Sequence, residues 1–340
     1  MKRQDTFPFT AIIGQENMKQ ALVLNVVNPR LGGVLIQGEK GTAKSTAVRA
    51  LADLLPPRRC IAGCRFHDDP DAPGAWCDEC HEKYDHEAPE VELLPMKVVE
   101  LPVSATEDRV VGTLDIEAAI REGKRSFETG ILADANRNIL YVDEINLLDD
   151  HVVDVLLDSA AMGINTVERE GISFSHPARF SLVGTMNPEE GDIRPQLLDR
   201  FALSVYVAGE KDLDKRAEVI KRRLEYEDDP AAFVAKWAEE QKNEVRRIER
   251  AMKLLPQVTA DNEILRLAAK LSIALGVDGH RADITLIKTA ETLAAVDGHT
   301  EVNREDLRTA AKLALPHRMR RRPFEEQSLN WDDVDKVIDE

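Results

Sequence analysis

The sequence predicts an α/β protein in which a parallel sheet flanked by helices precedes an all-α domain. In the first 210 residues, short β-branched apolar runs alternate with helical patterns, and such alternation gives a parallel sheet covered by helices. From about residue 211 the strand-like runs stop and a hydrophobic period near 3.6 takes over. We therefore expect an α/β domain at 1–210 and a helical domain at 211–340.

Five apolar runs have the composition of strands buried on both faces. They cover residues 33–38, 98–101, 139–142, 180–183 and 203–207. Helical patterns in this half of the chain include residues 17–27, 45–54 and 152–161. In the second half, helices are expected at residues 212–226, 230–254, 260–275, 282–296 and 304–315, and Trp331 and Val334 favour a short docked helix near the end.

Composition and charge indicate a soluble globular protein. The chain is 43% hydrophobic and 31% charged, with a net charge of −17, which argues against a role built on binding phosphate backbones. One basic cluster, residues 318–322, is interpreted as the cationic end of a solvated helix, with nucleic acid or an acidic partner as the alternative. No stretch has the length of a signal peptide core or a membrane span, so a cytoplasmic location is expected.

A phosphate-binding loop is predicted between the first strand and a helix. Its residues are Gly38, Glu39, Lys40, Gly41, Thr42, Ala43, Lys44 and Ser45, followed by Thr46. Lys44 would reach the β- and γ-phosphates of a nucleotide, and the Ser45 hydroxyl would bind Mg²⁺. Ala43 stands where the usual pattern has glycine, which requires a right-handed backbone at that residue. The alternative is an ordinary glycine-containing turn.

Three later features complete a candidate ATPase site. Asp143 and Glu144 end a buried strand, where the first can hold Mg²⁺ and the second can act as general base; a structural carboxylate pair is the alternative. Asn187 ends another strand and can orient the attacking water, although Asn-Pro is also a common turn. Arg200 and Arg281 can offer guanidinium groups to the γ-phosphate, if they are not ordinary surface arginines.

Four cysteines cluster just after the helix of the phosphate loop. Cys60, Cys64, Cys77 and Cys80 form two close pairs across an acidic, turn-rich spacer, a pattern typical of a four-thiolate zinc site. His67 and His81 are substitute ligands. A metal would be the simplest means of folding a segment with so small an apolar core. An iron–sulfur cluster and reduced, unliganded thiols are the alternatives.

The order of these motifs resembles the AAA+ superfamily, and several stretches are similar to the ATPase subunit I of magnesium chelatase. These stretches include Gly38-Glu-Lys-Gly-Thr-Ala-Lys-Ser-Thr46, Tyr141-Val-Asp-Glu-Ile-Asn-Leu-Leu148, Gly184-Thr-Met-Asn-Pro-Glu-Glu-Gly191 and Val277-Asp-Gly-His-Arg-Ala-Asp283. The similarity covers about residues 7–320, the cysteine segment excepted. It implies Walker A contacts at Lys44 and Ser45, a Walker B pair at Asp143 and Glu144, sensor 1 at Asn187, an arginine finger acting in trans at Arg200, sensor 2 at Arg281, and Gln15 near the adenine.

The resemblance also implies a wider machine. Two hairpin inserts are expected at residues 102–128 and 163–180, and the second also has β-branched arms around Glu170-Gly171. Family members form rings, with hexamers expected. They work with an AAA+-like partner that carries an adhesion domain, the D component of the chelatase, and with a large porphyrin-binding partner, its H component. Together they insert Mg²⁺ into protoporphyrin IX for chlorophyll biosynthesis. The chemistry predicted for this chain is ATP hydrolysis with Mg²⁺.

Four alternatives to this function remain at the level of sequence. The chain resembles ATPases that serve cobalt insertion into a related tetrapyrrole, and MoxR-like AAA+ chaperones of metalloenzymes. A DNA-remodelling motor is less compatible with the acidic charge of the chain. A nucleotide-gated scaffold without hydrolysis is less compatible with the presence of Glu144 and Arg200.

Overall fold

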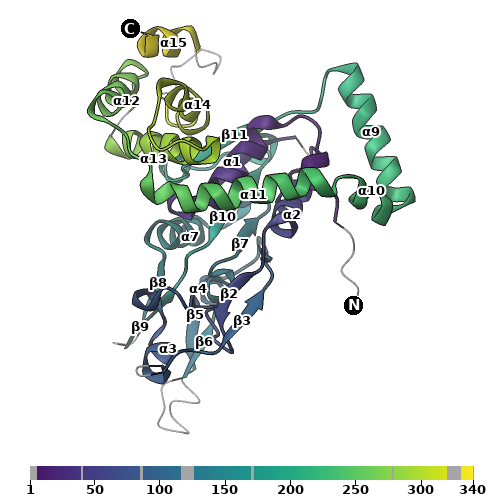
Figure 1. Ribbon diagram of the computed structural model, residues 1–340. Coiled ribbons are helices and arrows are strands. Elements are labelled where there is room, and N and C mark those ends of the chain that lie inside the picture. Colours follow the sequence, from purple (N-terminus) through teal and green to yellow (C-terminus); the bar gives the residue numbers. More distant parts are fainter. Residues whose placement is uncertain are drawn as a thin grey trace.

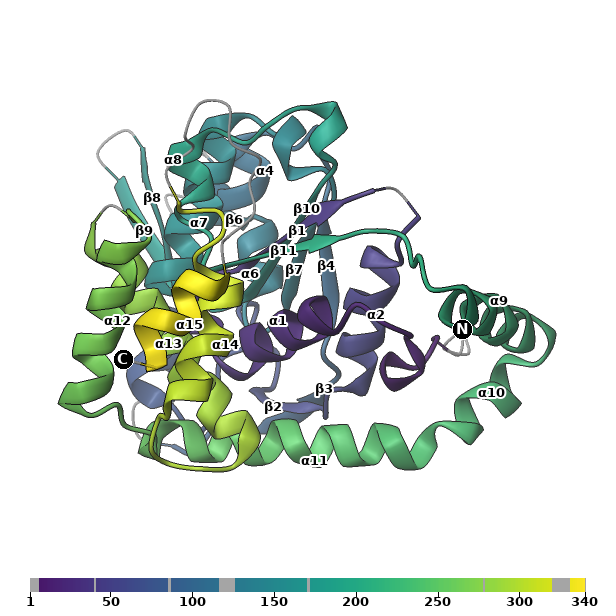
Figure 2. The same ribbon diagram turned by 90° about the horizontal axis from the view of Figure 1, so that it is seen from above.

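The computed structural model describes residues 6–39, 41–84, 87–115, 126–169, 172–277, 279–319 and 331–339. At its centre is a five-stranded parallel sheet in the order β11-β1-β10-β7-β4 (Figures 1 and 2). The strands are β1 (Val34–Gly38), β4 (Val98–Leu101), β7 (Ile139–Val142), β10 (Ser181–Met186) and β11 (Leu203–Val207). The predicted α/β class is confirmed.

Alternate residues of each central strand enter different cores. In β1, Val34 and Ile36 join one apolar cluster while Leu35 joins the other. In β7, Tyr141 faces the first cluster and Val142 the second. Because successive side chains of a strand point to opposite faces, this division places an apolar core on each side of the sheet and explains why the strands are apolar throughout.

Helices cover both faces of the sheet. The first core contains residues of α1 (Glu16–Val27) and α2 (Lys44–Leu54). The second contains residues of α4 (Glu107–Val111), α6 (Ile131–Ala135), α7 (Asp150–Met162) and α8 (Pro195–Leu198). This arrangement fixes the ends of the strands in a rigid frame, and the functional residues project from those ends.

After β11 the described chain is helical. Its helices are α9 (Leu213–Asp228), α10 (Pro230–Lys236), α11 (Ala238–Leu254), α12 (Asn262–Ala274), α13 (His280–Asp297), α14 (Arg304–Ala314) and α15 (Trp331–Asp339). The single helix expected over residues 230–254 is divided in two, because Trp237 has φ −99° and ψ 6° and interrupts the helical backbone. Helices α9 and α10 project from the body as an arm, and α11 returns across the front of the molecule (Figure 1).

The helical region shares its core with the sheet. Ile248 of α11 and Leu286 of α13 are fully buried in the same cluster as Leu24 of α1 and Val205 of β11. Helix α15 docks as expected, with Val334 completely buried. A change in secondary structure near residue 210 therefore marks a change of architecture but no break in the apolar core.

Three antiparallel strand pairs extend below the sheet at one end of the molecule (Figure 1). They are β2 (Arg58–Ile61) with β3 (Val91–Leu94), β5 (Gly112–Asp115) with β6 (Ser126–Thr129), and β8 (Ile164–Arg169) with β9 (Ile172–Pro177). The last two correspond to the expected inserts at 102–128 and 163–180. The turn predicted at residues 170–171 lies outside the described residues, but the two strands that flank it are paired as expected.

The basic cluster is not simply a solvated helix end. Arg318 is buried, donates hydrogen bonds to the carbonyls of Phe201 and Ala202, and forms an ion pair with Asp199. Residues 320–322 lie outside the described part of the chain. Arg318 thus ties the segment after α14 to the start of β11. Among the described helices, none is long and apolar enough to cross a membrane.

Candidate nucleotide-binding and hydrolysis site

The described residues of the predicted phosphate loop, together with Asp143, Glu144 and Asn187, meet at one edge of the sheet. Strands β1, β10 and β7 are neighbours and parallel, so their carboxyl ends lie together. Gly38 ends β1, Asn187 follows β10 and Asp143 follows β7. One pocket there is lined by Gly41, Thr42, Ala43, Lys44, Ser45, Thr46, Tyr141, Asp143, Glu144, Thr185, Met186 and Asn187.

Gly38 is required by the close approach of β11. A Cβ atom added at this residue would lie 1.9 Å from the carbonyl oxygen of Val207, and the φ angle of 143° is unfavourable for residues with a side chain. Gly41 also has positive φ, at 78°, but open space around it. The first glycine therefore packs the loop against the sheet, while the second serves only the turn.

The backbone at Ala43 differs from the expectation. Ala43 has φ 61° and ψ 22°, so it lies in the left-handed region and not in the right-handed one that the sequence interpretation required. An alanine there is strained because its Cβ crowds the following carbonyl. The loop adopts the conformation that the usual glycine would favour, in spite of the residue that replaces it.

The loop directs positive potential into the pocket. Helix α2 begins at Lys44 directly after the loop, so the positive end of the helix dipole faces the phosphate oxygens expected in this pocket. The Lys44 ammonium donates a hydrogen bond to the Gly38 carbonyl at 2.6 Å, and Thr42 donates to the Glu39 carbonyl at 2.8 Å. Lys40 lies outside the described residues.

Asp143 is held by two hydroxyl groups that the sequence interpretation had not singled out. Its Oδ1 accepts hydrogen bonds from Tyr141 at 2.9 Å and from Thr185 at 2.5 Å. Burial raises the pKa of the Tyr141 hydroxyl, which keeps it a neutral donor. A carboxylate has about four acceptor positions, so a hydrated Mg²⁺ still finds ligands here, and Ser45 lines the same pocket. The donor set fits the expected cation.

Glu144 and Asn187 occupy the same pocket. Glu144 has a left-handed backbone, with φ 53°, and its N–H donates to the Thr185 hydroxyl at 3.2 Å. The buried Asn187 accepts a hydrogen bond from the N–H of Glu189 through its side-chain oxygen. Thr185 therefore links the candidate metal-binding carboxylate of Asp143 to the backbone of the candidate base. Its position two residues before Asn187 was the only sequence signal for this role.

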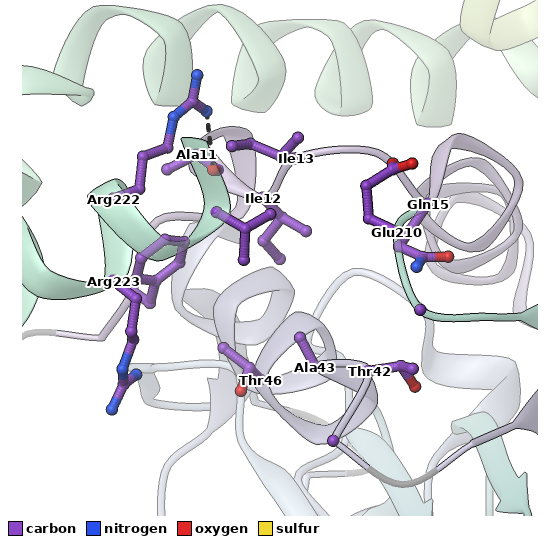
Figure 3. A pocket seen from close by; sticks show the side chains of 14 residues that line it. Ala11, Ile12, Ile13, Gln15, Thr42, Ala43, Thr46, Glu210, Arg222 and Arg223 are labelled. Carbon is purple, nitrogen blue, oxygen red and sulfur yellow. Dashed lines mark hydrogen bonds between the residues drawn. The ribbon is translucent and has the colours of Figure 1, made fainter. Parts of the chain in front are cut away.

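A second pocket continues from the other side of the loop (Figure 3). Gln15, which the resemblance predicts near the adenine, lines it, and its side-chain amide donates to the Ala208 carbonyl at 2.9 Å. The apolar side chains of Ile12 and Ile13 contribute to the lining. Arg222 and Arg223 of the α9 arm also reach it, and Arg222 donates to the Ala11 carbonyl at 3.0 Å. Sequence reasoning missed both arginines because only the fold brings α9 to this pocket.

Arg200 and Arg281 lie elsewhere. Arg200 forms ion pairs with Asp154 and Asp158 of α7, and Arg281 forms one with Asp199. Neither arginine is among the described residues that line the two pockets. The structure therefore does not bring them to the phosphate loop of their own chain, although Arg281 pairs with the residue that directly precedes Arg200.

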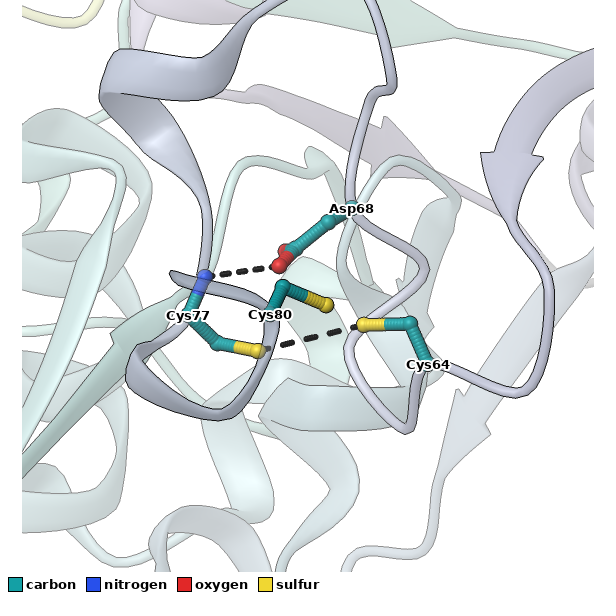
Figure 4. Close-up of side chains that lie close together, drawn as sticks. All are labelled: Cys64, Asp68, Cys77 and Cys80. Atoms are coloured by element: carbon teal, nitrogen blue, oxygen red, sulfur yellow. Dashed lines mark hydrogen bonds between the residues drawn. The ribbon is translucent and has the colours of Figure 1, made fainter. Parts of the chain in front are cut away.

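The cysteine segment departs from the expected four-thiolate group. The side chains of Cys64, Cys77 and Cys80 converge, but the fourth member is Asp68 (Figure 4). Cys60 is fully buried in β2, with its Sγ 3.7 Å from the Arg137 guanidinium. Neither His67 nor His81 belongs to the group. Asp68 follows Cys64 by four residues, just as Cys64 follows Cys60. This repeated spacing could have identified Asp68 as a candidate ligand from the sequence.

Comparison with known proteins agrees with this geometry. Residues 92–201 match the family described as AAA domain (dynein-related subfamily), and residues 265–339 match the AAA lid domain. The chain is 56% identical to the magnesium-chelatase subunit ChlI homolog of Methanocaldococcus jannaschii, over 100% of this chain and 93% of the relative. It is 50% identical to magnesium-chelatase subunit ChlI of Nostoc sp., over 95% and 87% of the two chains.

The chain belongs to the magnesium-chelatase subunit I family.

A solved structure supports the same assignment. The complex between subunits BchI and BchD of magnesium chelatase, derived from a cryo-EM reconstruction, contains a chain 48% identical to this one, with a TM-score of 0.55 and coverage of 98% and 100%. A putative ATPase from Cytophaga hutchinsonii, at 17% identity and a TM-score of 0.61, shares the fold. The family assignment and the pocket residues together make the chain an AAA ATPase with a subunit I architecture.

Proposed function

We propose that this chain hydrolyses ATP as the motor of a chelatase that inserts Mg²⁺ into protoporphyrin IX. The observation that carries the proposal is the meeting of the phosphate loop, Asp143, Glu144 and Asn187 at one sheet edge, in a member of the subunit I family. In the described part of the chain, the two pockets beside the loop suit a nucleotide. We assign binding of the porphyrin to the large partner protein.

The chain's own residues divide the work of hydrolysis. The loop amides and Lys44 bind the phosphates, and Ser45 and Asp143 position the Mg²⁺ that neutralises charge on them. Glu144 takes the proton of the attacking water while the Asn187 amide orients that water. Thr185 keeps Asp143 in place through a hydrogen bond of 2.5 Å. Support for these roles comes from the shared pocket, which Asp143, Glu144 and Asn187 line together with the phosphate loop.

A ring of identical copies, which we propose to be a hexamer, completes the site. Neither Arg200 nor Arg281 is among the described residues that line the pocket at the loop of their own chain, so a neighbouring copy is the natural recipient of their positive charge. Arg200 would act as the finger, stabilising the negative charge of the transition state. In the free chain, Asp154, Asp158 and Asp199 hold the two guanidinium groups.

The proposed partners are the AAA+-like D component and the large porphyrin-binding H component of the chelatase, in the cytoplasm. The solved BchI–BchD complex supports the first of these, because its BchI chain covers nearly the whole of this one. For the metal ion predicted at the cysteine segment we propose zinc with a structural role, separate from hydrolysis. The biological setting by analogy is chlorophyll biosynthesis, with a related tetrapyrrole pathway as the alternative.

Substitution Glu144→Gln tests the function. Loss of the base should lower ATP turnover by about 10²–10⁴-fold while ATP binding persists. Glu263→Gln is a matched control, because Glu263 lies on α12 in an exposed ion pair with Arg304. Unchanged turnover in the Glu144 variant would remove the assigned base.

The same variant identifies the client. Loaded with ATP and Mg²⁺ and recovered from the source cell, it should retain a large tetrapyrrole-binding protein together with the AAA+-like partner that carries an adhesion domain. A cobalt-type large partner would redirect the proposal to cobalt insertion. An unrelated metalloenzyme, without any tetrapyrrole-binding partner, would support the chaperone alternative and overturn the chelatase function.

A further inference from the structure

The four convergent side chains of the cysteine segment have the geometry of a metal site. One sulfur or oxygen atom from each of Cys64, Asp68, Cys77 and Cys80 lies within 4.8 Å of all the others (Figure 4). The Sγ atoms of Cys64 and Cys77 are 3.9 Å apart. Two thiolates bound tetrahedrally to one zinc ion, at about 2.3 Å each, are separated by about 3.8 Å. The spacing is therefore that of zinc ligands and far longer than a disulfide.

Asp68 provides an independent indication of a cation. Its side chain is 1% exposed, and its Oδ1 is buried without a hydrogen-bond partner. Its other oxygen, Oδ2, accepts a hydrogen bond of 2.6 Å from the N–H of Cys77. A buried carboxylate oxygen without a partner is costly unless a positive charge lies beside it. The thiols of Cys64, Cys77 and Cys80 surround the Asp68 carboxylate, and none of them supplies a positive charge.

Backbone groups already support the ligands. The N–H of Phe66 donates to the Sγ of Cys64 at 3.4 Å, and the Cys77 N–H fixes the orientation of Asp68. Such outer hydrogen bonds orient ligands and stabilise negative charge on them. Cys77 lies at the start of α3 (Asp78–Lys83) and Cys80 in its first turn, so the helix presents both thiols to the same point.

The donor set selects zinc among common metals. Three thiolates and one carboxylate give a closed tetrahedral site of mixed soft and hard ligands, which suits Zn²⁺ better than Mg²⁺ or Ca²⁺. An iron–sulfur cluster usually takes four cysteines, and Cys60 is directed to Arg137 instead. The local apolar core is small, with Ile61, Phe66 and Ala133 as its buried members besides two of the cysteines. A bound metal would supply stability that this core lacks.

We propose that Cys64, Asp68, Cys77 and Cys80 bind one structural Zn²⁺, and that this ion braces the two hairpin inserts. The loop between Cys64 and Asp68 makes the contacts with the two inserts. Arg65 donates to the Phe127 carbonyl of β6 at 3.0 Å. The fully buried Phe66 stacks on His176 of β9, with ring centroids 4.7 Å apart. Ordering of this loop by zinc therefore orders one strand of each insert.

This role connects the metal to the machine without a part in hydrolysis. Phe127 and Phe174 stack on each other, with centroids 4.0 Å apart, and so join the two inserts next to Phe66. Zinc, loop and both hairpins then form one unit below the sheet. The inference rests on these contacts and stands whether or not the chain serves a magnesium chelatase.

Metal content of the purified full-length chain gives the first test. We expect one zinc per chain in the wild type, with metal content reduced at least 10-fold in Cys77→Ser and Asp68→Asn. Two matched controls should retain the metal: Cys60→Ala, which removes the fourth cysteine, and Asp69→Asn, which removes a neighbouring carboxylate paired with Arg137. Cobalt loaded in place of zinc should show the visible absorption of a tetrahedral thiolate site.

Each contrary result overturns a defined part of the proposal. Retention of zinc in Asp68→Asn with loss in Cys60→Ala would restore the four-cysteine ligand set. Iron with acid-labile sulfide would replace zinc by a cluster, and a wild type that binds neither zinc nor cobalt would remove the site.

Hydrogen exchange tests the bracing and does not depend on the folding of a variant. Removal of zinc from the wild type by a chelator should speed amide exchange in β6 and β9 more than in β1 or β10, and restored zinc should reverse this. Equal exchange in the hairpins with and without zinc would refute the bracing role even if the ion is bound.

Discussion

Substitution of Ala43 by glycine should stabilise the protein, which is the reverse of the usual effect of glycine inside a helix. The left-handed backbone of Ala43, with φ 61°, costs about 1–2 kcal/mol for a residue with a Cβ. Glycine removes that strain, but the unfolded chain gains conformational entropy worth about 0.5–1 kcal/mol. The side chain of Ala43 is exposed, so little apolar burial is lost. The net expectation is a gain of about 0.7 kcal/mol.

Urea denaturation of wild type and variant under identical conditions measures this difference. With a slope of about 3 kcal/mol per molar, the midpoint should rise by about 0.2 M. Ala269→Gly is a suitable control, because Ala269 lies inside α12 in an ordinary helical backbone and should lose about 1 kcal/mol. ATP turnover should be retained, since the loop already has the conformation that glycine favours.

The sign of the change decides the argument. A loss of roughly 0.5–1 kcal/mol on Ala43→Gly is what glycine costs at a right-handed helical residue, and it would refute the left-handed backbone of this loop. It would also restore the original interpretation of why alanine is accepted beside Lys44.

Three further outcomes follow from the contacts of the site and the core. Thr185→Val removes a hydroxyl that donates a hydrogen bond to Asp143, the proposed Mg²⁺ ligand. The Mg²⁺ concentration that gives half-maximal ATPase activity should therefore rise about 10–100-fold, and an unchanged Mg²⁺ titration would contradict this. Gly38→Ala places a Cβ 1.9 Å from the Val207 carbonyl oxygen, so it should lower the free energy of unfolding in urea by about 3 kcal/mol and abolish ATP binding. Gly41→Ala meets open space and should lower it by about 1 kcal/mol. Equal losses in the two variants would contradict the close approach of β11 to Gly38. Burial, with a smaller contribution from the adjacent arginine, lowers the pKa of His317 from 6.5 to about 3. As the pH falls through this interval, the unfolded chain takes up a proton that the folded chain does not. The free energy of unfolding should therefore decrease by up to about 1.4 kcal/mol per pH unit more steeply in the wild type than in His317→Gln, and the two profiles should have equal slopes above pH 7. Parallel pH profiles below pH 6 would contradict a neutral imidazole at this partly buried residue.

The parts of the fold that depend on local pattern were predictable. Strand alternation and the order of the phosphate loop, the Asp143–Glu144 pair and Asn187 sufficed to place three strand ends together, because parallel strands present their carboxyl ends at one edge. The β8–β9 hairpin was also visible in the sequence as two β-branched arms around a turn.

The parts that depend on packing between distant segments were not predictable. Arg281 reaches Asp199 only because the helical region packs against β11 and not over the phosphate loop. Arg222 lines the nucleotide pocket because the α9 arm turns back towards the start of the chain. Asp68 replaces Cys60 in the metal group because β2 directs Cys60 towards Arg137, which residue spacing alone does not reveal.

The continuous apolar core limits which parts of the protein ATP can move. Rotation of α11, α13 and α14 as a body would separate Ile248 and Leu286 from α1, at a cost of about 25 cal/mol for every Å² exposed to water. Movement of α9 would expose less apolar surface, since this helix has no buried residue and its Leu213, Ile220 and Leu224 are already exposed. Because Arg222 and Arg223 of that arm line the second pocket beside the phosphate loop, we expect a bound nucleotide to displace α9 more readily than the helices that share the core of the sheet.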